Sequence, residues 1–300
     1  MTLISTLLSA PFASIIDEPN RRRRELIEKI QEKTGRKLIT YVANLNAPAG
    51  NVIDYNDATL VNDILSLLEF PKELDIIIHS GGGLAEATQK LVSMLRDKTA
   101  SIRFIIPEMA KSAATLLSFA GDEILMSYMS ELGPIDPQIL MGFDPATKQP
   151  VYWPAWSVIH SVDSLEESFK KGMTPQIVGA LLQQVNPLLL DVARKAIEYS
   201  KTLAKDWLTN YMKLDAVKAG EIADYFADLK THLSHGRVIN YVEAKNRGLK
   251  VTKIDENSEM WKLISELHLR TKLFMVPPIT KVLDCEKHSY FQQITIAPVK

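Results

Sequence analysis

Cysteine is nearly absent from this sequence. Its 300 residues include one, Cys285, which excludes an internal disulfide framework and offers no paired thiolates for zinc. The chain also lacks an excess of either charge, because 35 Lys and Arg residues nearly balance 36 Asp and Glu residues. Such a balance gives no global field that would attract nucleic acid. We therefore expect a cytoplasmic protein without a nucleic-acid partner, whose function lies in a local site.

Long hydrophobic runs are missing as well. The most apolar N-terminal stretch, residues 3–16, is shorter than the roughly 20 residues that span a bilayer, and it contains Pro11. Four arginines, Arg21 to Arg24, follow this stretch, whereas a secretory signal carries its positive charges in front. We favour an arm that packs or contacts another protomer and leads into a solvated helix. An interfacial membrane anchor is the alternative.

Motifs for cofactors and metals are also absent from the sequence. It contains neither GxGxxG nor GxxxxGK[ST], the glycine patterns of nucleotide-binding loops. Its six histidines show no HxxxH spacing and no recurring carboxylate–histidine spacing. We therefore predict no cofactor and no metal site. An ATP-driven unfoldase, if one serves this protein, must be a separate partner.

Strand and helix patterns alternate in the first half of the chain. Short apolar runs typical of buried strands occur at 37–45, 75–79, 101–106 and 123–126. Helical spacing of apolar residues fills the intervals at 57–68, 84–95 and 113–121, with Asp57 as the expected N-cap of the first. This alternation implies right-handed crossovers and a parallel sheet, and therefore an α/β fold.

Four regions follow from these patterns. Residues 1–36 are expected to form an N-terminal arm and helix, and residues 37–140 the α/β core. Residues 141–250 would be a helical extension that completes the core and the site. This extension begins with FDPATKQPVYWPAW, which is rich in proline and aromatic residues and is predicted to be irregular. Residues 251–300 are predicted to form a C-terminal tail.

The glycine run HSGGG, residues 79–83, lies between a predicted strand and a predicted helix. Backbone N–H groups in such a turn can bind an anion or an oxyanion, which makes Gly82 and Gly83 candidate donors. The structural alternative is a tight turn that requires a positive φ and has no chemical role.

Ser112 occupies an equivalent place after the next strand, in PEMAKSAAT. Adjacent parallel strands end at one edge of a sheet, so the Gly82 and Ala113 N–H groups would converge beside the Ser112 hydroxyl. A nucleophile with two such donors is the arrangement of acyl-transfer catalysis. A plain N-cap is the alternative for Ser112. Lys111 is a candidate base, although adjacent helical residues do not face each other.

Two later segments contain candidates for the other two members of a catalytic triad. Asp136 lies in LGPIDPQ, where two prolines impose an extended backbone, and a buried Asp there could orient a histidine as in a Ser-His-Asp relay. The alternative is an Asp that bonds its own turn. His235, which precedes Gly236 in a predicted loop, is the best-placed histidine, and a solvated turn residue is its alternative.

The residues from HSGGG through PEMAKSAATLLSFAGDEILMSYMSELGPIDPQ resemble the serine dehydrogenase proteinase family. That family belongs to the Clp protease and crotonase superfamily and is related to signal peptide peptidase A. The resemblance covers about residues 38–140, with a weaker second match at LSHGRVINYVEAKNRGLKV. It implies a ClpP/crotonase-like spiral of ββα units with an additional helical region.

The resemblance also implies roles for individual residues. Ser112 would be the nucleophile, Gly82 and Ala113 the oxyanion donors, and Asp136 and His235 the remaining members of a triad. The sequence departs from the Clp turn SPGG by having glycine after the serine. We also expect no N-terminal membrane helix of the kind that many family members have.

The leading prediction is therefore a serine peptidase that acts on a peptide or protein substrate. A Ser-Lys dyad using Lys111, Lys170 or Lys171 is the mechanistic variant. The alternatives are a non-proteolytic oligomeric scaffold with the same fold and a crotonase-like acyl-CoA enzyme. Because relatives in the superfamily assemble into rings or stacked trimers, we expect a homo-oligomer.

Overall fold

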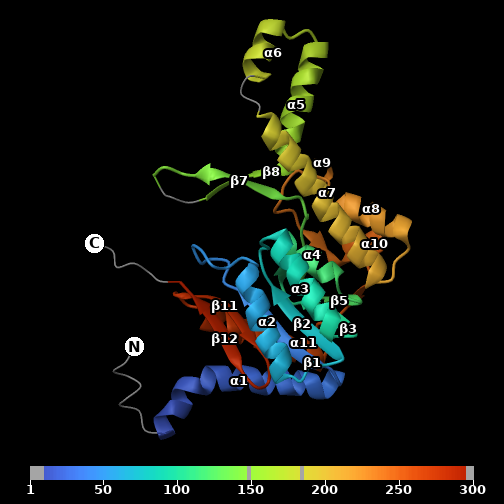
Figure 1. Ribbon diagram of the computed structural model, residues 1–300. Helices are drawn as coiled ribbons and strands as arrows, with labels where there is room; N and C mark the ends of the chain where they lie inside the picture. Colours follow the sequence, from blue (N-terminus) through green and yellow to red (C-terminus); the bar gives the residue numbers. More distant parts are fainter. Residues whose placement is uncertain (1–9, 147–149, 183–185, 295–300) are drawn as a thin grey trace.

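The computed structural model describes residues 10–146, 150–182 and 186–294 of the chain. A seven-stranded sheet in the order β10-β5-β3-β2-β1-β11-β12 lies at its centre (Figure 1). Its strands are β1 (Lys37–Ala43), β2 (Glu73–His79), β3 (Ser101–Ile106), β5 (Glu123–Met126), β10 (Val251–Lys253), β11 (Ile279–Asp284) and β12 (Ser289–Gln293). The first five are parallel, and β11 and β12 are antiparallel to their neighbours. The predicted α/β class is confirmed. The sheet is mixed, because β11 and β12 add an antiparallel edge to the five parallel strands.

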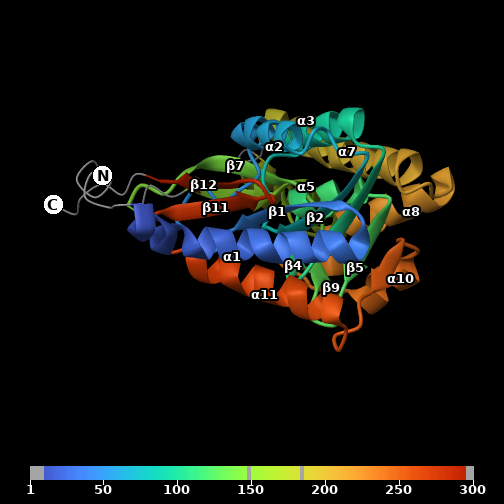
Figure 2. The same cartoon turned by 90° about the horizontal axis from the view of Figure 1, so that it is seen from below.

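Helices cover both faces of this sheet (Figure 2). One layer consists of α2 (Tyr55–Leu67), α3 (Ala85–Lys98), α4 (Ala113–Phe119), α7 (Pro187–Asn210) and α8 (Ala216–Ala227). The other consists of α1 (Ala10–Thr34) and α11 (Glu259–Phe274), which pack against each other and the sheet. Strands β1, β2 and β3 are buried on both faces and are apolar along most of their length.

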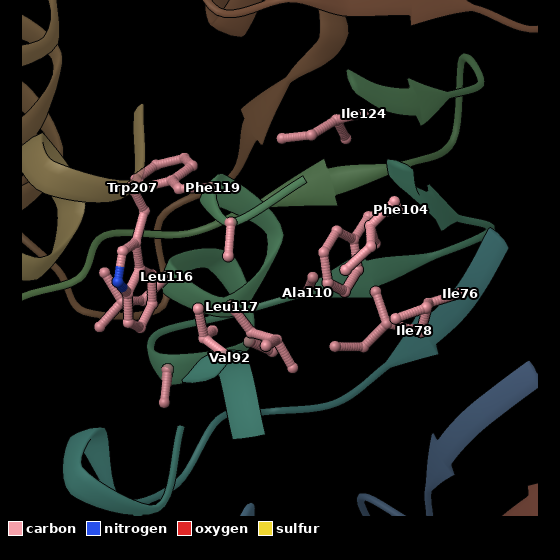
Figure 3. Close-up of a cluster of buried hydrophobic side chains, with 14 of the residues drawn as sticks. Ile76, Ile78, Val92, Phe104, Ala110, Leu116, Leu117, Phe119, Ile124 and Trp207 are labelled. Carbon is pink, nitrogen blue, oxygen red and sulfur yellow. The ribbon is translucent and has the colours of Figure 1, made fainter. Parts of the chain in front are cut away.

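The larger core lies between the sheet and the first helical layer (Figure 3). Ile76 and Ile78 of β2 point into it, together with Leu117 of α4 and Trp207 of α7. Burial of each apolar side chain of this size stabilises the folded state by roughly 1.5–3 kcal/mol. This packing fixes α4, whose first residue follows Ser112, against the end of the sheet.

A small second sheet lies beside the end of β2. It contains β4 (Met109–Ala110), β6 (Glu131–Leu132) and β9 (Ile239–Asn240), flanked by α9 (Leu229–His232) and α10 (Tyr241–Arg247). Strand β9 joins residues far apart in sequence, because it pairs with β6. The loop before β9, which contains His235, is thereby held close to the segment after β6.

The segment predicted to be irregular is instead half of a hairpin. Strands β7 (Gln138–Phe143) and β8 (Pro150–Pro154) pair with each other, and residues 147–149 lie outside the described part. The prolines stand at the two ends of β8, where proline is tolerated, and Val, Tyr and Trp between them favour a strand. Beyond the hairpin, α5 (Ala155–Lys170), α6 (Pro175–Leu182) and the first turns of α7 form an arm that projects from the body (Figure 1).

The two ends of the chain also differ from the prediction. Residues 251–294 supply three strands of the central sheet and α11, rather than a tail. Helix α1 is not solvated throughout, because Arg23 is fully buried and its Nε donates to Asp284 Oδ2 at 2.8 Å. Of the proposed arm or anchor at 3–16, residues 3–9 lie outside the described part, and the rest begins α1. None of the described helices is both long and apolar enough to span a bilayer.

The start of α2 lies slightly upstream of the prediction. Asp54 is the N-cap and accepts from the Asn56 N–H, while Asp57 occupies the third helical position. The Asp57 side chain accepts from the Asp54 N–H and completes a capping box. The predicted N-cap, Asp57, was thus three residues too late, because either Asp satisfies the sequence pattern.

Candidate active site

The glycine turn and the Ser112 segment are joined by backbone contacts. Ser80 N donates to Met109 O at 3.2 Å, and Lys111 N donates to Ser80 O at 3.0 Å. Gly82 has a φ of 113°, and a Cβ added to it would lie 2.7 Å from Ser112 Cβ. A side chain at position 82 therefore cannot fit, and glycine brings this turn directly against Ser112.

Ser112 has a strained backbone. Its φ of 50° and ψ of −122° are unusual for a residue with a side chain, and such conformations cost about 1–3 kcal/mol. Although Ser112 stands at the N-cap position of α4, its side chain makes no capping hydrogen bond. The plain N-cap interpretation is therefore not supported. Ser112 instead lines a cavity.

Asp136 and His235 form a hydrogen-bonded pair. His235 Nδ1 lies 2.8 Å from Asp136 Oδ1, and the Asp136 side chain is fully buried. Because a carboxylate can only accept, Nδ1 donates this hydrogen bond, and in the neutral ring Nε2 is left as an acceptor. Gln138 Nε2 donates to the second carboxylate oxygen at 3.2 Å, so both oxygens have partners. The sequence motif LGPIDPQ contained Gln138, but its role was not recognised.

Ser112 and His235 line the same cavity, which has a volume of about 490 Å³. The lining includes all the residues proposed above for catalysis except Asp136 and the three lysines, namely Ser112, Ala113, Gly82, Gly83 and His235. Its other walls are mainly apolar and include Val52, Leu84, Leu116, Ile135, Tyr152 and Tyr199. In the described structure no hydrogen bond joins Ser112 to His235. Catalytic hydrogen bonds are often long without substrate and shorten when it binds.

The candidate oxyanion donors differ in their present partners. Ala113 is the first residue of α4, so its N–H has no acceptor within the helix. The Gly82 N–H donates to Ser80 Oγ at 3.1 Å, a contact that sequence reasoning missed. Gly83 approaches Ile53 so closely that an added Cβ would lie 2.3 Å from its backbone. Both glycine positions require the absence of a side chain.

Lys111 points away from this cavity. Its Nζ donates to the carbonyl oxygens of Leu132 and Arg237, each at 3.1 Å, and lies 2.9 Å from Glu131 Oε1. These three partners occupy the ammonium group and connect β6 to the loop that carries His235. The geometry gives Lys111 a structural role and does not bring it to the cavity lining.

The other two lysine candidates lie in the projecting arm. Lys170 is the last residue of α5 and Lys171 is its C-cap. Both side chains are largely exposed, and they pair with Glu166 and Glu167 one helical turn earlier. Neither lines the cavity with Ser112.

The sequence was compared with models of known protein families. The sequence profile described as ClpP-like SDH-type serine proteinase matches residues 1–279. The chain belongs to this family of serine proteinases. The resemblance drawn from HSGGG and PEMAKSAAT is thereby confirmed, as is the ClpP-like fold.

The individual relatives share about a quarter of their aligned residues with this chain. Two uncharacterized proteins of Methanocaldococcus jannaschii are 27% identical over 208 residues and 26% identical over 235 residues. These alignments cover 67% and 76% of this chain, and 62% and 73% of the relatives' own lengths. Among solved structures, a mutant of the membrane-bound stomatin-specific protease 1510-N matches with a TM-score of 0.43 and 14% identity. That match covers 71% of this chain and 79% of the other.

Proposed function

We propose that this serine proteinase cleaves peptide bonds by nucleophilic attack of Ser112. His235 Nε2 accepts the hydroxyl proton as Oγ bonds to the carbonyl carbon, and Asp136 stabilises the resulting imidazolium. The imidazolium then protonates the leaving amine, and water hydrolyses the acyl-enzyme by the same steps. The observation that carries this proposal is the hydrogen bond between the buried Asp136 and His235, which lines the same cavity as Ser112.

Two backbone N–H groups would stabilise the negative charge on the carbonyl oxygen. The Ala113 N–H lies at the N-terminus of α4, and the Gly82 N–H lies in the turn packed against Ser112. In the proposed mechanism the oxyanion replaces Ser80 Oγ as the acceptor of the Gly82 N–H. Gly83 would contribute to binding the substrate backbone. Loss of one such donor typically lowers kcat about 10²- to 10³-fold.

The substrate would be a peptide or protein with an apolar side chain near the cleaved bond. The cavity walls support this choice, because Val52, Leu116 and Ile135 contact whatever occupies the space beside Ser112. We further propose that the protein acts as a homo-oligomer in the cytoplasm. The single buried Cys285 fits a reducing compartment.

A fluorophosphonate probe tests the nucleophile, because the oxygen of an activated serine bonds to phosphorus and displaces fluoride. We expect one labelled residue, Ser112, and loss of the label in Ser112→Ala. Ser118→Ala is the matched control, since Ser118 lies on the same helix but its hydroxyl donates to Ala114 O. A folded wild-type protein that neither takes the label nor cleaves unstructured peptides would contradict the proposal. That outcome would favour a non-proteolytic scaffold.

A further inference from the structure

Three polar side chains gather on the side of the sheet covered by α1 and α11. His79 ends β2, Glu108 lies between β3 and β4, and His268 belongs to α11. One nitrogen or oxygen atom from each lies within 4.8 Å of the others. The three residues come from distant parts of the sequence, which explains why no motif spacing predicted them.

The two histidines are buried without complete hydrogen bonding. His79 is 2% exposed and His268 is 7% exposed. The Nδ1 atoms of both rings have no hydrogen-bond partner in the described structure. His79 Nδ1 faces Glu108 Oε2 at 3.9 Å, and His268 Nε2 lies 2.9 Å from the same oxygen. Buried polar atoms normally have partners, so His79 Nδ1, which faces the Glu108 carboxylate, requires an explanation.

We propose that His79, Glu108 and His268 bind a divalent transition-metal ion, with zinc as the best fit. Two imidazoles and a carboxylate are a common ligand set for zinc, and imidazole favours late transition metals over magnesium or calcium. With bonds of roughly 2.0–2.2 Å, tetrahedral ligand atoms lie about 3.4 Å apart. The 3.9 Å between His79 Nδ1 and Glu108 Oε2 would therefore shorten, and the 2.9 Å between His268 Nε2 and Glu108 Oε2 would lengthen, each by about 0.5 Å.

Lys272 shows that the carboxylate attracts a cation. Its Nζ lies 2.6 Å from Glu108 Oε2, and its side chain is 39% exposed. A flexible, partly exposed side chain can withdraw or remain on one carboxylate oxygen when an ion binds. Glu108 itself is 28% exposed, which gives the ion a route from solvent.

The position of the cluster indicates what the ion would do. His79 precedes Ser80, and Glu108 precedes Met109, the two residues whose backbones join the glycine turn to the Ser112 segment. An ion bound to both would fix these segments to each other and to α11. The site is therefore structural, and its existence does not depend on the proposed peptidase activity.

Zinc titration of chelator-treated full-length protein tests the proposal. Calorimetry and metal analysis should find one tightly bound Zn²⁺ per chain, and zinc should raise the thermal unfolding midpoint by a few degrees. His268→Gln and Glu108→Gln should each weaken zinc binding more than the roughly 10- to 100-fold that follows loss of an outer hydrogen-bond partner. Circular dichroism confirms that each variant is folded.

Two other histidine variants locate the ion. His160→Gln changes an exposed helical histidine on α5 and should leave zinc affinity within about twofold of wild type. His235→Asn should also retain the ion, because His235 lies in the Ser112 cavity. The proposal is overturned if wild type binds no stoichiometric zinc. It is equally overturned if His235→Asn abolishes binding while folded His268→Gln retains it.

Discussion

Ser112 combines properties that a structural helix cap does not need. Its backbone lies at a positive φ, its hydroxyl caps nothing, and the turn around Gly82 leaves no room for a Cβ beside it. Strained conformations persist only where surrounding packing holds them, and α4 is completely buried behind Ser112. The buried α4 therefore holds the strained backbone of Ser112, which lines the cavity.

Asp136→Asn should reduce activity strongly without unfolding the protein. The amide keeps the shape of the carboxylate but favours the wrong histidine tautomer, and comparable changes in serine proteases cost about 10⁴-fold in kcat. The rate of fluorophosphonate labelling measures the effect. Equal labelling rates in Asp136→Asn and wild type would remove Asp136 from the mechanism.

Lys111→Met provides the contrasting variant. It should lower stability, because Lys111 binds Leu132 O, Arg237 O and Glu131, but Ser112 should still be labelled in the folded protein. We expect a loss of about 1–3 kcal/mol in the free energy of unfolding, since buried acceptors lose their partner. If folded Lys111→Met loses labelling as completely as Ser112→Ala, a Ser-Lys dyad is the better mechanism.

Cys285 should be unreactive in the native protein. The residue is fully buried, and desolvation raises the pKa of its thiol, so the reactive thiolate is scarce at pH 7–8. Ellman's reagent should count almost no thiol per native chain and one after unfolding in guanidinium chloride. Cys285→Ser should give no signal in either state. Rapid reaction of the native protein would show that the edge around β11 opens readily.

At the scale of elements, the C-terminal strands support the candidate site from a distance. Strand β11 carries Lys281, whose fully buried Nζ lies 2.5 Å from Asp57 Oδ1 and 2.9 Å from Val52 O. Ile53 follows Val52 in the chain. Its backbone N–H donates to Gly82 O, and its carbonyl oxygen accepts from the Leu84 N–H. A strand that sequence reasoning assigned to a tail thus holds the loop against the glycine turn.

Lys281→Met should therefore reduce both stability and activity. Removing one partner leaves the Asp57 charge buried and unpaired, which typically costs 3–5 kcal/mol. Adding Asp57→Asn should restore part of this loss, because the unpaired charge is then gone. Denaturant unfolding measures both effects. Lys287→Met is the control, since Lys287 is exposed, and a loss there as large as in Lys281→Met would contradict the argument.

The strand and helix patterns between residues 37 and 126 were predictable because each element there is local and buried on a regular face. The pairing of β11 with β1 was not, since residues 279–284 and 40–43 are distant in sequence and no local pattern records their contact. The same limit applies to the site. Its residues could be nominated from motifs and from the family resemblance, which already favoured His235 over Lys111. The hydrogen bond between His235 and Asp136 joins residues 99 positions apart, and no local pattern records it. Gln138 and Ser80 gave no signal of their own.

At the scale of the whole molecule, the hairpin stands out because it projects from the body and exposes large apolar side chains (Figure 1). Strands β7 and β8 form a two-stranded sheet of their own and project from the body (Figure 1). Leu140 and Phe143 on β7 are 48% and 63% exposed, and Tyr152 and Trp153 on β8 are 53% and 51% exposed. An isolated two-stranded ribbon is marginally stable in water, and clustered exposed apolar residues mark contact surfaces.

We expect a second copy of the chain to cover the hairpin, in keeping with the proposed homo-oligomer. Replacing both Leu140 and Phe143 by serine should lower the solution mass toward that of a monomer, measured by light scattering after size-exclusion chromatography. Val217→Ser is the control, because Val217 is 71% exposed on α8, away from the hairpin. Tyr152, which lines the Ser112 cavity, belongs to the same hairpin, so dissociation should also slow labelling of Ser112. A wild-type protein that is monomeric at tens of micromolar would contradict this assembly, as would a double variant with unchanged mass.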